Sequence, residues 1–233
     1  MNPQPVGLAT DLAPLQVMRS KVGLHDVAVW RSARGVVCAW ENRCPHRGMR
    51  LSYGFVRGES LACAYHGWHY NCSGQCHYIP AHPELTPPQS IRPIIFGVTE
   101  YAGLLWVDPS SESQLSKQSE GQPVGVGVGL PLNLQPLRTL SIDCKLDALT
   151  GALADAASPG DSSRKAIVKS VSEQPRILVI DAKGTVNAVY LVLHTPPKQP
   201  VLAHIMVQAT LTVEDRILVS RWCESLRRSA ESL

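Results

Sequence analysis

The chain has 233 residues, enough for one large domain or two small ones, and 44% of them are apolar, while Gly 17 and Pro 18 fall well short of a low-complexity composition. Disorder is therefore excluded over most of the length. The net charge is only +3 with scattered basic residues, and no apolar run or signal peptide indicates membrane targeting, so we expect a cytoplasmic protein with neither a nucleic-acid nor a membrane partner.

The first part of the chain, residues 1–108, has the pattern of a small antiparallel β domain. From Val22 to Asp108, short runs of β-favouring residues alternate with Gly, Pro and Asn. The runs that we predict as strands are Val27–Trp30, Val36–Trp40, Leu61–Tyr65 and Gly103–Val107.

A polar linker is predicted over residues 109–130. Its first part, Pro109–Pro123, lacks any hydrophobic periodicity, which is typical of a linker. The alternating glycines at 125, 127 and 129 superficially suggest a phosphate-binding loop. They lack the G-x-G-x-x-G spacing and follow no strand, so we interpret them as flexible linker.

Residues 131–233 mix helical and strand patterns, which predicts an α+β domain. Leu146, Leu149, Leu153 and Ala157 have helical spacing within Lys145–Ser158. The later segment predicts a hairpin of Arg176–Ile180 and Thr185–His194, followed by a strand at Val201–Val213. The last predicted element is a helix at Glu214–Leu233, with Thr212 as candidate N-cap. Its apolar stripe contains Leu218, Trp222, Leu226 and Ala230.

Two short motifs carry the chemistry. Cys44-Pro-His46-Arg-Gly48 is followed by Cys63-Ala-Tyr-His66-Gly67-Trp68, so each motif contributes one cysteine and one histidine on a tight turn. Thiolates on one iron and neutral imidazoles on the other form one class of [2Fe-2S] cluster. The odd total of seven cysteines is also better explained by metal ligation than by a disulfide framework.

Zinc is the competing metal, because two Cys and two His also form its tetrahedral sites. Zinc sites usually place both cysteines on one turn and both histidines on another. Here each turn carries one of each, which favours the iron–sulfur cluster. Two loops rich in Pro and Gly would also be an unusual way to pack a metal-free core.

The motifs resemble those of the Rieske non-haem iron oxygenases, in the branch of vanillate O-demethylase and phthalate dioxygenase. The resemblance covers about residues 22–109 and also includes Gly74-Gln-Cys76, Ile79-Pro80-Ala81 and Gly103-Leu-Leu-Trp106. It implies an N-terminal Rieske [2Fe-2S] domain over residues 1–108. The cluster ligands that it implies are Cys44, His46, Cys63 and His66.

The resemblance also separates this cluster from the respiratory type. Respiratory Rieske proteins have an additional cysteine in each loop, joined as a disulfide, where this chain has Met49 and Tyr65. Trp68 stands where they have a serine that donates a hydrogen bond to the cluster. Fewer hydrogen bonds to the sulfurs imply a lower reduction potential, as in oxygenases and ferredoxins.

The second half departs from the family. The family's catalytic domain binds iron through Asp-x-x-His-x4-His on a helix and a distant carboxylate. In the matching helix, Asp147 stands at the acidic relay position, but Thr150 and Asp155 replace both histidines. The domain after the linker is also shorter than usual, so we expect residues 131–233 to be a degenerate catalytic domain without a third ligand.

We therefore predict an electron-transfer subunit that is not catalytic alone. It would pair with a catalytically complete oxygenase subunit in a head-to-tail hetero-oligomer and receive electrons from a flavin reductase or ferredoxin. The alternatives are a stand-alone Rieske ferredoxin and a purely structural subunit. The length beyond Asp108 argues against the ferredoxin.

Other polar residues have ordinary explanations. His194 and His204 on predicted strands are a possible metal pair, although strand histidines are more often partly exposed or hydrogen-bonded. Asp143 and Asp147 are interpreted as a solvated helix face apart from the relay position. We expect Cys72 and Cys76 to pack as small apolar residues, with extra metal ligands or a redox pair as the alternatives. Arg47 is either a charge that docks a partner or an exposed side chain.

Overall fold

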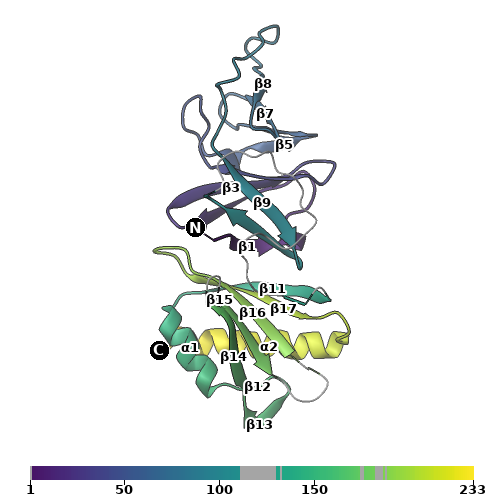
Figure 1. Cartoon of the computed structure of the whole chain (residues 1–233), viewed down its shortest axis with the longest axis vertical. Coiled ribbons are helices and arrows are strands. Elements are labelled where there is room, and N and C mark those ends of the chain that lie inside the picture. Colours follow the sequence, from purple (N-terminus) through teal and green to yellow (C-terminus); the bar gives the residue numbers. More distant parts are fainter. Residues whose placement is uncertain (1, 111–129, 132, 174–175, 182–185, 187) are drawn as a thin grey trace. The chain divides into compact units, whose positions relative to one another are not determined.

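The computed structural model describes residues 2–110, 130–131, 133–173, 176–181, 186 and 188–233. The chain divides into two units (Figure 1): unit 1 comprises residues 1–101 and 105–123, and unit 2 comprises residues 102–104 and 124–233. Almost all of the predicted linker, including the glycines at 125, 127 and 129, lies outside the described residues. Among the described residues, no helix is long and apolar enough to span a membrane.

Unit 1 contains a six-stranded sheet in the order β1-β10-β9-β4-β3-β2. In the antiparallel β2–β3–β4 meander, β3 and β4 correspond to the predicted strands Val27–Trp30 and Val36–Trp40, whereas β2 was not predicted. The strands and the first short 3₁₀ helix are β1 (Gln4–Leu8), η1 (Ala9–Asp11), β2 (Val17–Val22), β3 (His25–Arg31), β4 (Val37–Glu41), β9 (Ile95–Tyr101) and β10 (Leu104–Asp108).

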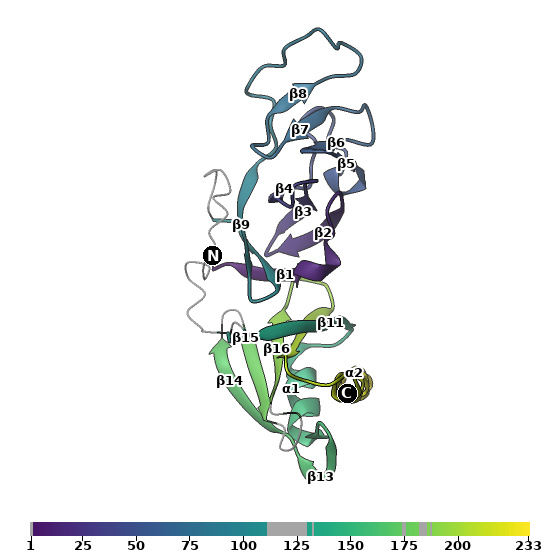
Figure 2. The ribbon, with the colours of Figure 1, turned by 90° about the vertical axis from the view of Figure 1, so that its right-hand side faces the viewer.

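A second, four-stranded sheet of unit 1 has the order β5-β6-β7-β8 (Figure 2). The predicted strand at Leu61–Tyr65 is wrong in its second half, because β6 ends at Ala62 and the chain turns at Cys63. The elements of this part are η2 (Leu51–Tyr53), β5 (Phe55–Arg57), β6 (Ser60–Ala62), β7 (His69–Asn71) and β8 (Cys76–Tyr78).

Three buried aromatic residues connect the two sheets of unit 1. The Trp30 and Trp40 rings, on β3 and β4, pack edge to face with centroids 5.0 Å apart. Trp40 also packs on Tyr70 of β7, at 6.4 Å. All three are at most 1% exposed, and such aromatic pairs stabilise a core beyond the area they bury. The core therefore fixes where β7 lies against β4.

Unit 2 is built on a five-stranded antiparallel sheet in the order β11-β17-β16-β15-β14. The predicted strand at Val201–Val213 ends earlier, at Gln208. The strands of unit 2 are β11 (Leu134–Ile142), β12 (Ala157–Ser158), β13 (Asp161–Lys165), β14 (Ile167–Glu173), β15 (Arg176–Asp181), β16 (Ala188–His194) and β17 (Val201–Gln208).

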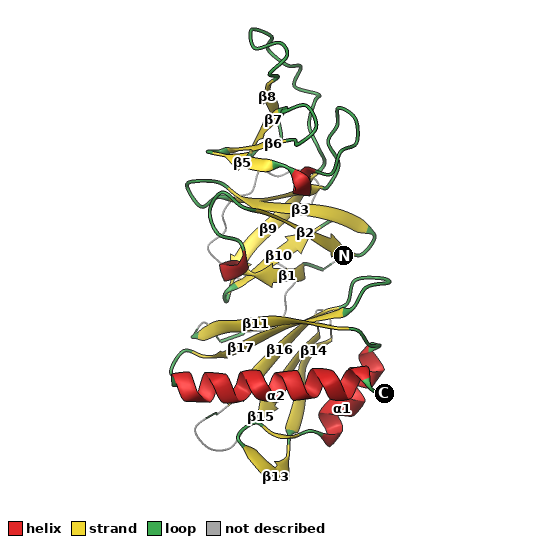
Figure 3. Cartoon of the chain, turned by 180° about the vertical axis from the view of Figure 1, so that it is seen from behind, coloured by secondary structure: helices red, strands yellow, loops and turns green. Residues whose placement is uncertain are grey.

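Helices α1 (Leu146–Asp155) and α2 (Val213–Glu231) cover one face of this sheet (Figure 3). The α+β fold class is confirmed, but the predicted bounds of α1 are too wide. Ala157 and Ser158 form strand β12 instead, and Pro159 favours this extended conformation at Ser158, the residue before it. The buried stripe of α2 also differs from the predicted one: its members are Val219, Cys223, Leu226 and Ala230, a spacing closer to 3.6 residues per turn.

A capping box begins α2, as the sequence suggested for Thr212. The Thr212 hydroxyl accepts a hydrogen bond from the backbone N–H of Asp215 at 3.1 Å. The Asp215 carboxylate in turn accepts one from the backbone N–H of Thr212 at 3.3 Å. Two of the donors that a helix start leaves unpaired are thus satisfied.

We expect Thr212→Ala to lower the free energy of unfolding of unit 2 by ~1 kcal/mol, because the N-cap acceptor is lost. Urea unfolding followed by circular dichroism in the helical band reports on unit 2, since both described α-helices lie there. Thr210→Ala, at an exposed threonine before the helix, is the matched control and should have no measurable effect. Equal losses in the two variants would contradict the capping assignment.

Candidate iron–sulfur centre

We call the two loops that carry the predicted ligands the ligand loops. The first ligand loop follows β4 and turns back on itself at Cys44. The Cys44 N–H donates to the Met49 carbonyl and the Gly48 N–H donates to the Cys44 carbonyl, both at 2.8 Å. Gly48 has a φ of +72°, in the left-handed region that favours glycine. The sequence therefore folds into a narrow turn that presents Cys44 and His46.

The second ligand loop repeats this construction between β6 and β7. The Cys63 N–H donates to the Trp68 carbonyl at 2.9 Å, and the Gly67 N–H donates to the Cys63 carbonyl at 3.0 Å. Gly67 has a φ of +68°, and a Cβ atom there would lie 3.0 Å from Pro80 Cγ. The two motifs thus form two loops with the same hydrogen-bond pattern.

The structure brings the two cysteines together in the interior of unit 1. Cys44 and Cys63 are buried, and their thiols share a hydrogen bond. Tyr70 Oη lies 3.1 Å from Cys44 Sγ. The hydrogen bonds from Cys63 and Tyr70 lower the pKa of Cys44 to about 6, whereas the contact with Cys44 raises the pKa of Cys63.

Backbone N–H groups point at both sulfurs. Those of His46 and Arg47 hydrogen-bond Cys44, and those of Tyr65 and His66 hydrogen-bond Cys63. Each contact favours the thiolate over the thiol. The two loops thus offer a pair of stabilised thiolates to a metal, and thiolate is the form in which cysteine ligates iron.

The two histidines form a second pair, nearer the surface. The ring centroids of His46 and His66 are 4.8 Å apart. Trp68 stacks on His46 at 4.1 Å and Tyr65 stacks on His66 at 3.8 Å, so each imidazole has an aromatic ring behind it. Burial, with His66 and Arg47 nearby, lowers the pKa of His46, which keeps this ring neutral as a metal ligand must be.

The donor set fits a binuclear cluster better than a single ion. Within the described ranges, no three side chains of His, Cys, Asp or Glu converge on one ion-sized position. The thiols form one pair and the imidazoles another, which is the division that a Rieske [2Fe-2S] cluster requires of its two irons. Such a cluster supplies one-electron transfer when it is bound.

Sequence reasoning did not identify Tyr70. Alternation along His69-Tyr70-Asn71 could have placed it on the inner face of a strand. The bond to Cys44 connects residues that are 26 positions apart, however, and no local pattern encodes it.

Cys72 and Cys76 do not form a pair with each other. Cys76 is fully buried in the core, with its Sγ 3.9 Å from the Tyr78 carbonyl oxygen. It therefore packs as a small apolar residue, as expected. Cys72 is half-buried and packs against the hydrophobic cluster that contains Cys38 of β4.

His194 and His204 lie on β16 and β17, as predicted, and are both buried. Val192 pairs with His204, so the two histidines are diagonal neighbours on one face of the sheet. The His204 ring nitrogen Nδ1 lies 2.9 Å from Thr139 Oγ1 on β11. This hydrogen bond fits the ordinary explanation of a satisfied strand histidine.

Polar side chains on α1 bond within their own helix or to a neighbouring strand. The Thr150 hydroxyl donates to the Asp147 carbonyl at 2.9 Å, and Asp155 is ion-paired with Lys165 at 3.2 Å. Asp143 and Asp147 are both exposed, as a solvated face would be.

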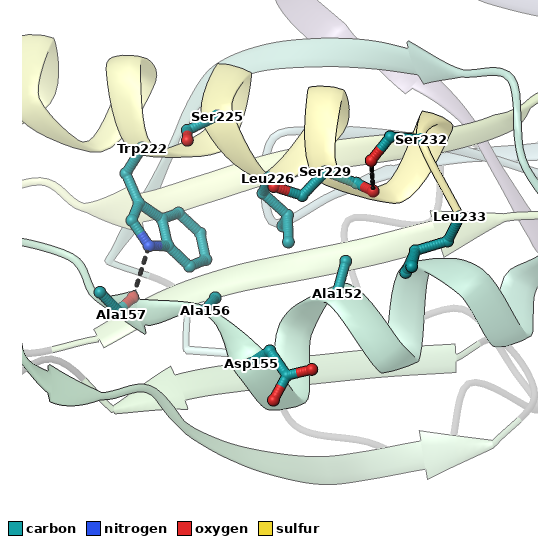
Figure 4. A pocket seen from close by; sticks show the side chains of 10 residues that line it. All are labelled: Ala152, Asp155, Ala156, Ala157, Trp222, Ser225, Leu226, Ser229, Ser232 and Leu233. Atoms are coloured by element: carbon teal, nitrogen blue, oxygen red, sulfur yellow. Dashed lines mark hydrogen bonds between the residues drawn. The ribbon is translucent and has the colours of Figure 1, made fainter.

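A cavity of about 380 Å³ lies between the end of α1 and α2 (Figure 4). Its lining contains no histidine or cysteine, and Asp155 is its single carboxylate. Beside it, the Trp222 indole N–H donates to the Ala157 carbonyl at 2.7 Å. The cavity therefore offers no imidazole to a metal.

Comparison with known proteins identifies the domain family of unit 1. A family model of the Rieske [2Fe-2S] domain matches residues 2–94. Residues 2–94 form a Rieske [2Fe-2S] domain. The cofactor prediction is thereby confirmed, and the cluster is favoured over zinc.

Sequence similarity to known proteins continues beyond the Rieske domain. Oxidoreductase NdmD of Pseudomonas putida is 30% identical over 98% of this chain and 40% of its own length. The 4beta-methylsterol monooxygenase of Methylococcus capsulatus is 41% identical over 42% of this chain and 27% of its own length. The chain thus spans well under half of these relatives.

Solved structures share the fold of the whole chain. NdmA of Pseudomonas putida matches with a TM-score of 0.70 and 19% identity over 99% of this chain and 79% of NdmA. Dicamba monooxygenase matches with a TM-score of 0.67 and 17% identity over 99% of this chain and 85% of its own. At these identities the similarity shows a shared fold, and in fold the predicted resemblance to the Rieske oxygenases is confirmed.

We expect Tyr70→Phe to lower the reduction potential of the Rieske domain. The Tyr70 hydroxyl favours the more negative, reduced state by bonding the Cys44 sulfur. Losing part of a bond to a charged acceptor should shift the potential by roughly 20–60 mV, as ~59 mV corresponds to about 1.4 kcal/mol for one electron.

The measurement is a redox titration followed by visible absorbance. Tyr53→Phe is the matched control, because Tyr53 is 57% exposed and its hydroxyl accepts a hydrogen bond from Arg50 instead. The Tyr53 variant should keep the wild-type potential. An unchanged potential in Tyr70→Phe would mean that this hydroxyl does not tune the cluster.

Proposed function

We propose that this chain transfers electrons through a cluster ligated by Cys44, Cys63, His46 and His66 to a separate, catalytically complete oxygenase subunit. It has no mononuclear iron site in unit 2 and turns over no substrate by itself. The observation that carries the proposal is the separation of the buried thiol pair from the outer imidazole pair, together with an α1 that offers no imidazole.

The position of the histidines supports electron exchange at the surface. His66 is exposed and His46 partly so, while both ligand cysteines are buried. An electron therefore has a short route between solvent-facing imidazoles and a protein docked over them. Arg47 is exposed beside His46 and is suited to an acidic partner surface.

The residues of α1 support the absence of a second iron site. A mononuclear non-haem iron typically uses two histidines and one carboxylate. Thr150 and Asp155 occupy the positions of the two histidines by resemblance, and both are engaged in bonds of their own.

The comparisons favour an electron-transfer component. NdmD, by name an oxidoreductase, aligns over 98% of this chain, whereas methylxanthine N1-demethylase NdmA aligns over 46%. Sequence similarity thus continues through unit 2 in an oxidoreductase. The proposed partner is an oxygenase subunit that receives electrons, in a head-to-tail hetero-oligomer fed by a flavin reductase or ferredoxin.

The ligand assignment predicts loss of the cluster in single variants. We expect His46→Ala or His66→Ala to abolish the visible absorbance of the purified protein and its two irons per chain, because one iron loses an imidazole. His77→Ala is the control, since His77 is exposed and hydrogen-bonded to Ser60 outside the loops. A coloured double variant of His46 and His66 would refute the ligand set.

Reconstitution tests the electron-transfer role. We expect the chain alone to form no product with any reductase, and a mixture with a complete oxygenase subunit to do so. Cys44→Ser should abolish the product formed at sites that this chain supplies, because the inner iron loses a thiolate. Asp147→Ala, an exposed change on α1, should leave turnover intact.

Two outcomes decide between this role and the alternatives. Product formation that continues with the Cys44 variant in an assembled complex would identify a structural subunit. Electron delivery without a stable complex, seen as a monomer in size-exclusion chromatography, would identify a freely diffusing carrier.

A further inference from the structure

A groove of about 540 Å³ lies in unit 1, and none of its lining residues belongs to the ligand loops. One wall consists of the end of η1, the turn after it and the start of β2. The other wall is β5, with Gly54 directly before it. The volume is in the range of ligand-binding pockets. Electron transfer through the cluster gives this groove no role.

Two large apolar side chains are exposed on opposite walls of the groove. Leu15 is 50% exposed on the first wall, and Phe55 is 58% exposed on β5. Leu15 is the third residue of a turn in which the Gln16 N–H donates to the Ala13 carbonyl at 3.2 Å, and its φ of +65° is in the left-handed region. Glycine is the usual residue there, because a side chain is strained. Strain of this kind is found most often at functional sites.

The edges of two β-sheets border the groove. β2 is the outermost strand of the six-stranded sheet, and β5 is the outermost strand of the four-stranded sheet. In the described part of the chain, no backbone hydrogen bond connects β2 with β5. Edge strands present N–H and C=O groups that can pair with another chain. The groove therefore offers main-chain hydrogen bonds as well as apolar contacts.

The strand register identifies the available backbone groups on β5. Arg57 and Ser60 flank a two-residue turn, and residues in that position form a hydrogen-bonded pair. Bonded and non-bonded pairs alternate along an antiparallel ladder. The N–H and C=O of Val56 therefore point away from β6, and Val56 lines the groove. One residue of an extended peptide can bond both groups.

Arg57 gives the groove a preference for charge. Its side chain is exposed, and its guanidinium carbon lies 5.8 Å from the centre of the Phe55 ring. None of the ion pairs among the described residues of unit 1 includes Arg57. Asp11 is exposed on the opposite wall. An acidic side chain is therefore favoured beside Arg57 and disfavoured beside Asp11.

We propose that this groove binds an extended segment of a partner protein, which adds a strand to β5. The added strand runs antiparallel, as do the other pairs of this sheet. From its N-terminus, the segment has an acidic residue opposite Arg57, an aliphatic residue opposite Val56 and a β-branched residue opposite Phe55. Leu15 covers the segment from the other wall. The proposal concerns unit 1 alone and does not rest on the proposed electron transfer.

Fluorescence anisotropy with a defined peptide tests strand addition. The probe is fluorescein-labelled Thr-Glu-Leu-Val-Thr amide, titrated with the full-length protein with its cluster bound. We expect saturable binding. A probe with an N-methylated leucine should bind roughly tenfold more weakly, because it cannot donate a hydrogen bond to the Val56 carbonyl. Equal binding of the two peptides would refute strand addition.

A charge reversal tests the orientation of the segment. We expect Arg57→Glu to weaken binding of the probe roughly tenfold, because the glutamate of the probe then faces a like charge. The same variant should bind a peptide with lysine in place of that glutamate more tightly than the wild-type protein does. Arg92→Glu, at an exposed arginine outside the groove, is the matched control and should change neither affinity. Equal effects of the two variants would contradict the placement beside Arg57.

Leu15→Gly separates binding from folding. We expect this variant to bind the probe several-fold more weakly, because an apolar contact is lost. It should unfold at the same or a higher urea concentration, since glycine relieves the left-handed strain. Leu24→Gly, at an 89% exposed leucine outside the groove, is the matched control and should keep the wild-type affinity. A less stable Leu15 variant with unchanged affinity would assign Leu15 a purely structural role and overturn its part in the site.

Two further outcomes would overturn the proposal. Lack of saturable binding up to the solubility limit of the protein would show that the groove takes no added strand. Self-association in analytical ultracentrifugation that Leu15→Gly abolishes would identify a second copy of this chain as the occupant. The visible spectrum of each variant establishes that it retains its cluster, so either failure leaves the electron-transfer proposal untouched.

Discussion

The hydrogen bond between the Tyr70 hydroxyl and the Cys44 sulfur connects the ligand loops to the packed interior of unit 1. Tyr70 is completely buried and packs on Trp40, which packs on Trp30. A buried hydroxyl cannot bond to water, so it needs an internal partner, and the Cys44 sulfur provides it. The aromatic core therefore determines the position of the Cys44 thiol, and the contact between Cys44 and Cys63 determines the position of the Cys63 thiol.

The same unit divides its ligands between interior and surface. Buried thiolates need donors, and the backbone N–H groups of both loops supply them. Neutral imidazoles need far less compensation, so His46 and His66 can stand near solvent with Trp68 and Tyr65 behind them. This division places the two sulfurs inside the unit and the edge of the two imidazoles at its surface.

Unit 2 shares its architecture with the oxygenases, but similarity of fold does not carry a reaction with it. Its five-stranded sheet and two helices are joined by an ordinary hydrophobic core. The polar groups of α1 bond to their own helix or to Lys165, and the nearby cavity lacks imidazole. The architecture of unit 2 by itself therefore assigns no chemistry to it.

The residue types and spacing of the Cys-His motifs were sufficient to predict the cofactor, and Thr212 to predict the start of α2, because ligand chemistry and helix capping depend on residues close together in sequence. Tertiary structure alone decided that Tyr70 bonds Cys44, and that Val219 and Cys223 rather than Leu218 are buried in the core of unit 2. Each of these contacts joins elements that are distant in the chain. Their partners are selected by how the sheets and helices pack, and local sequence patterns carry no information about that packing.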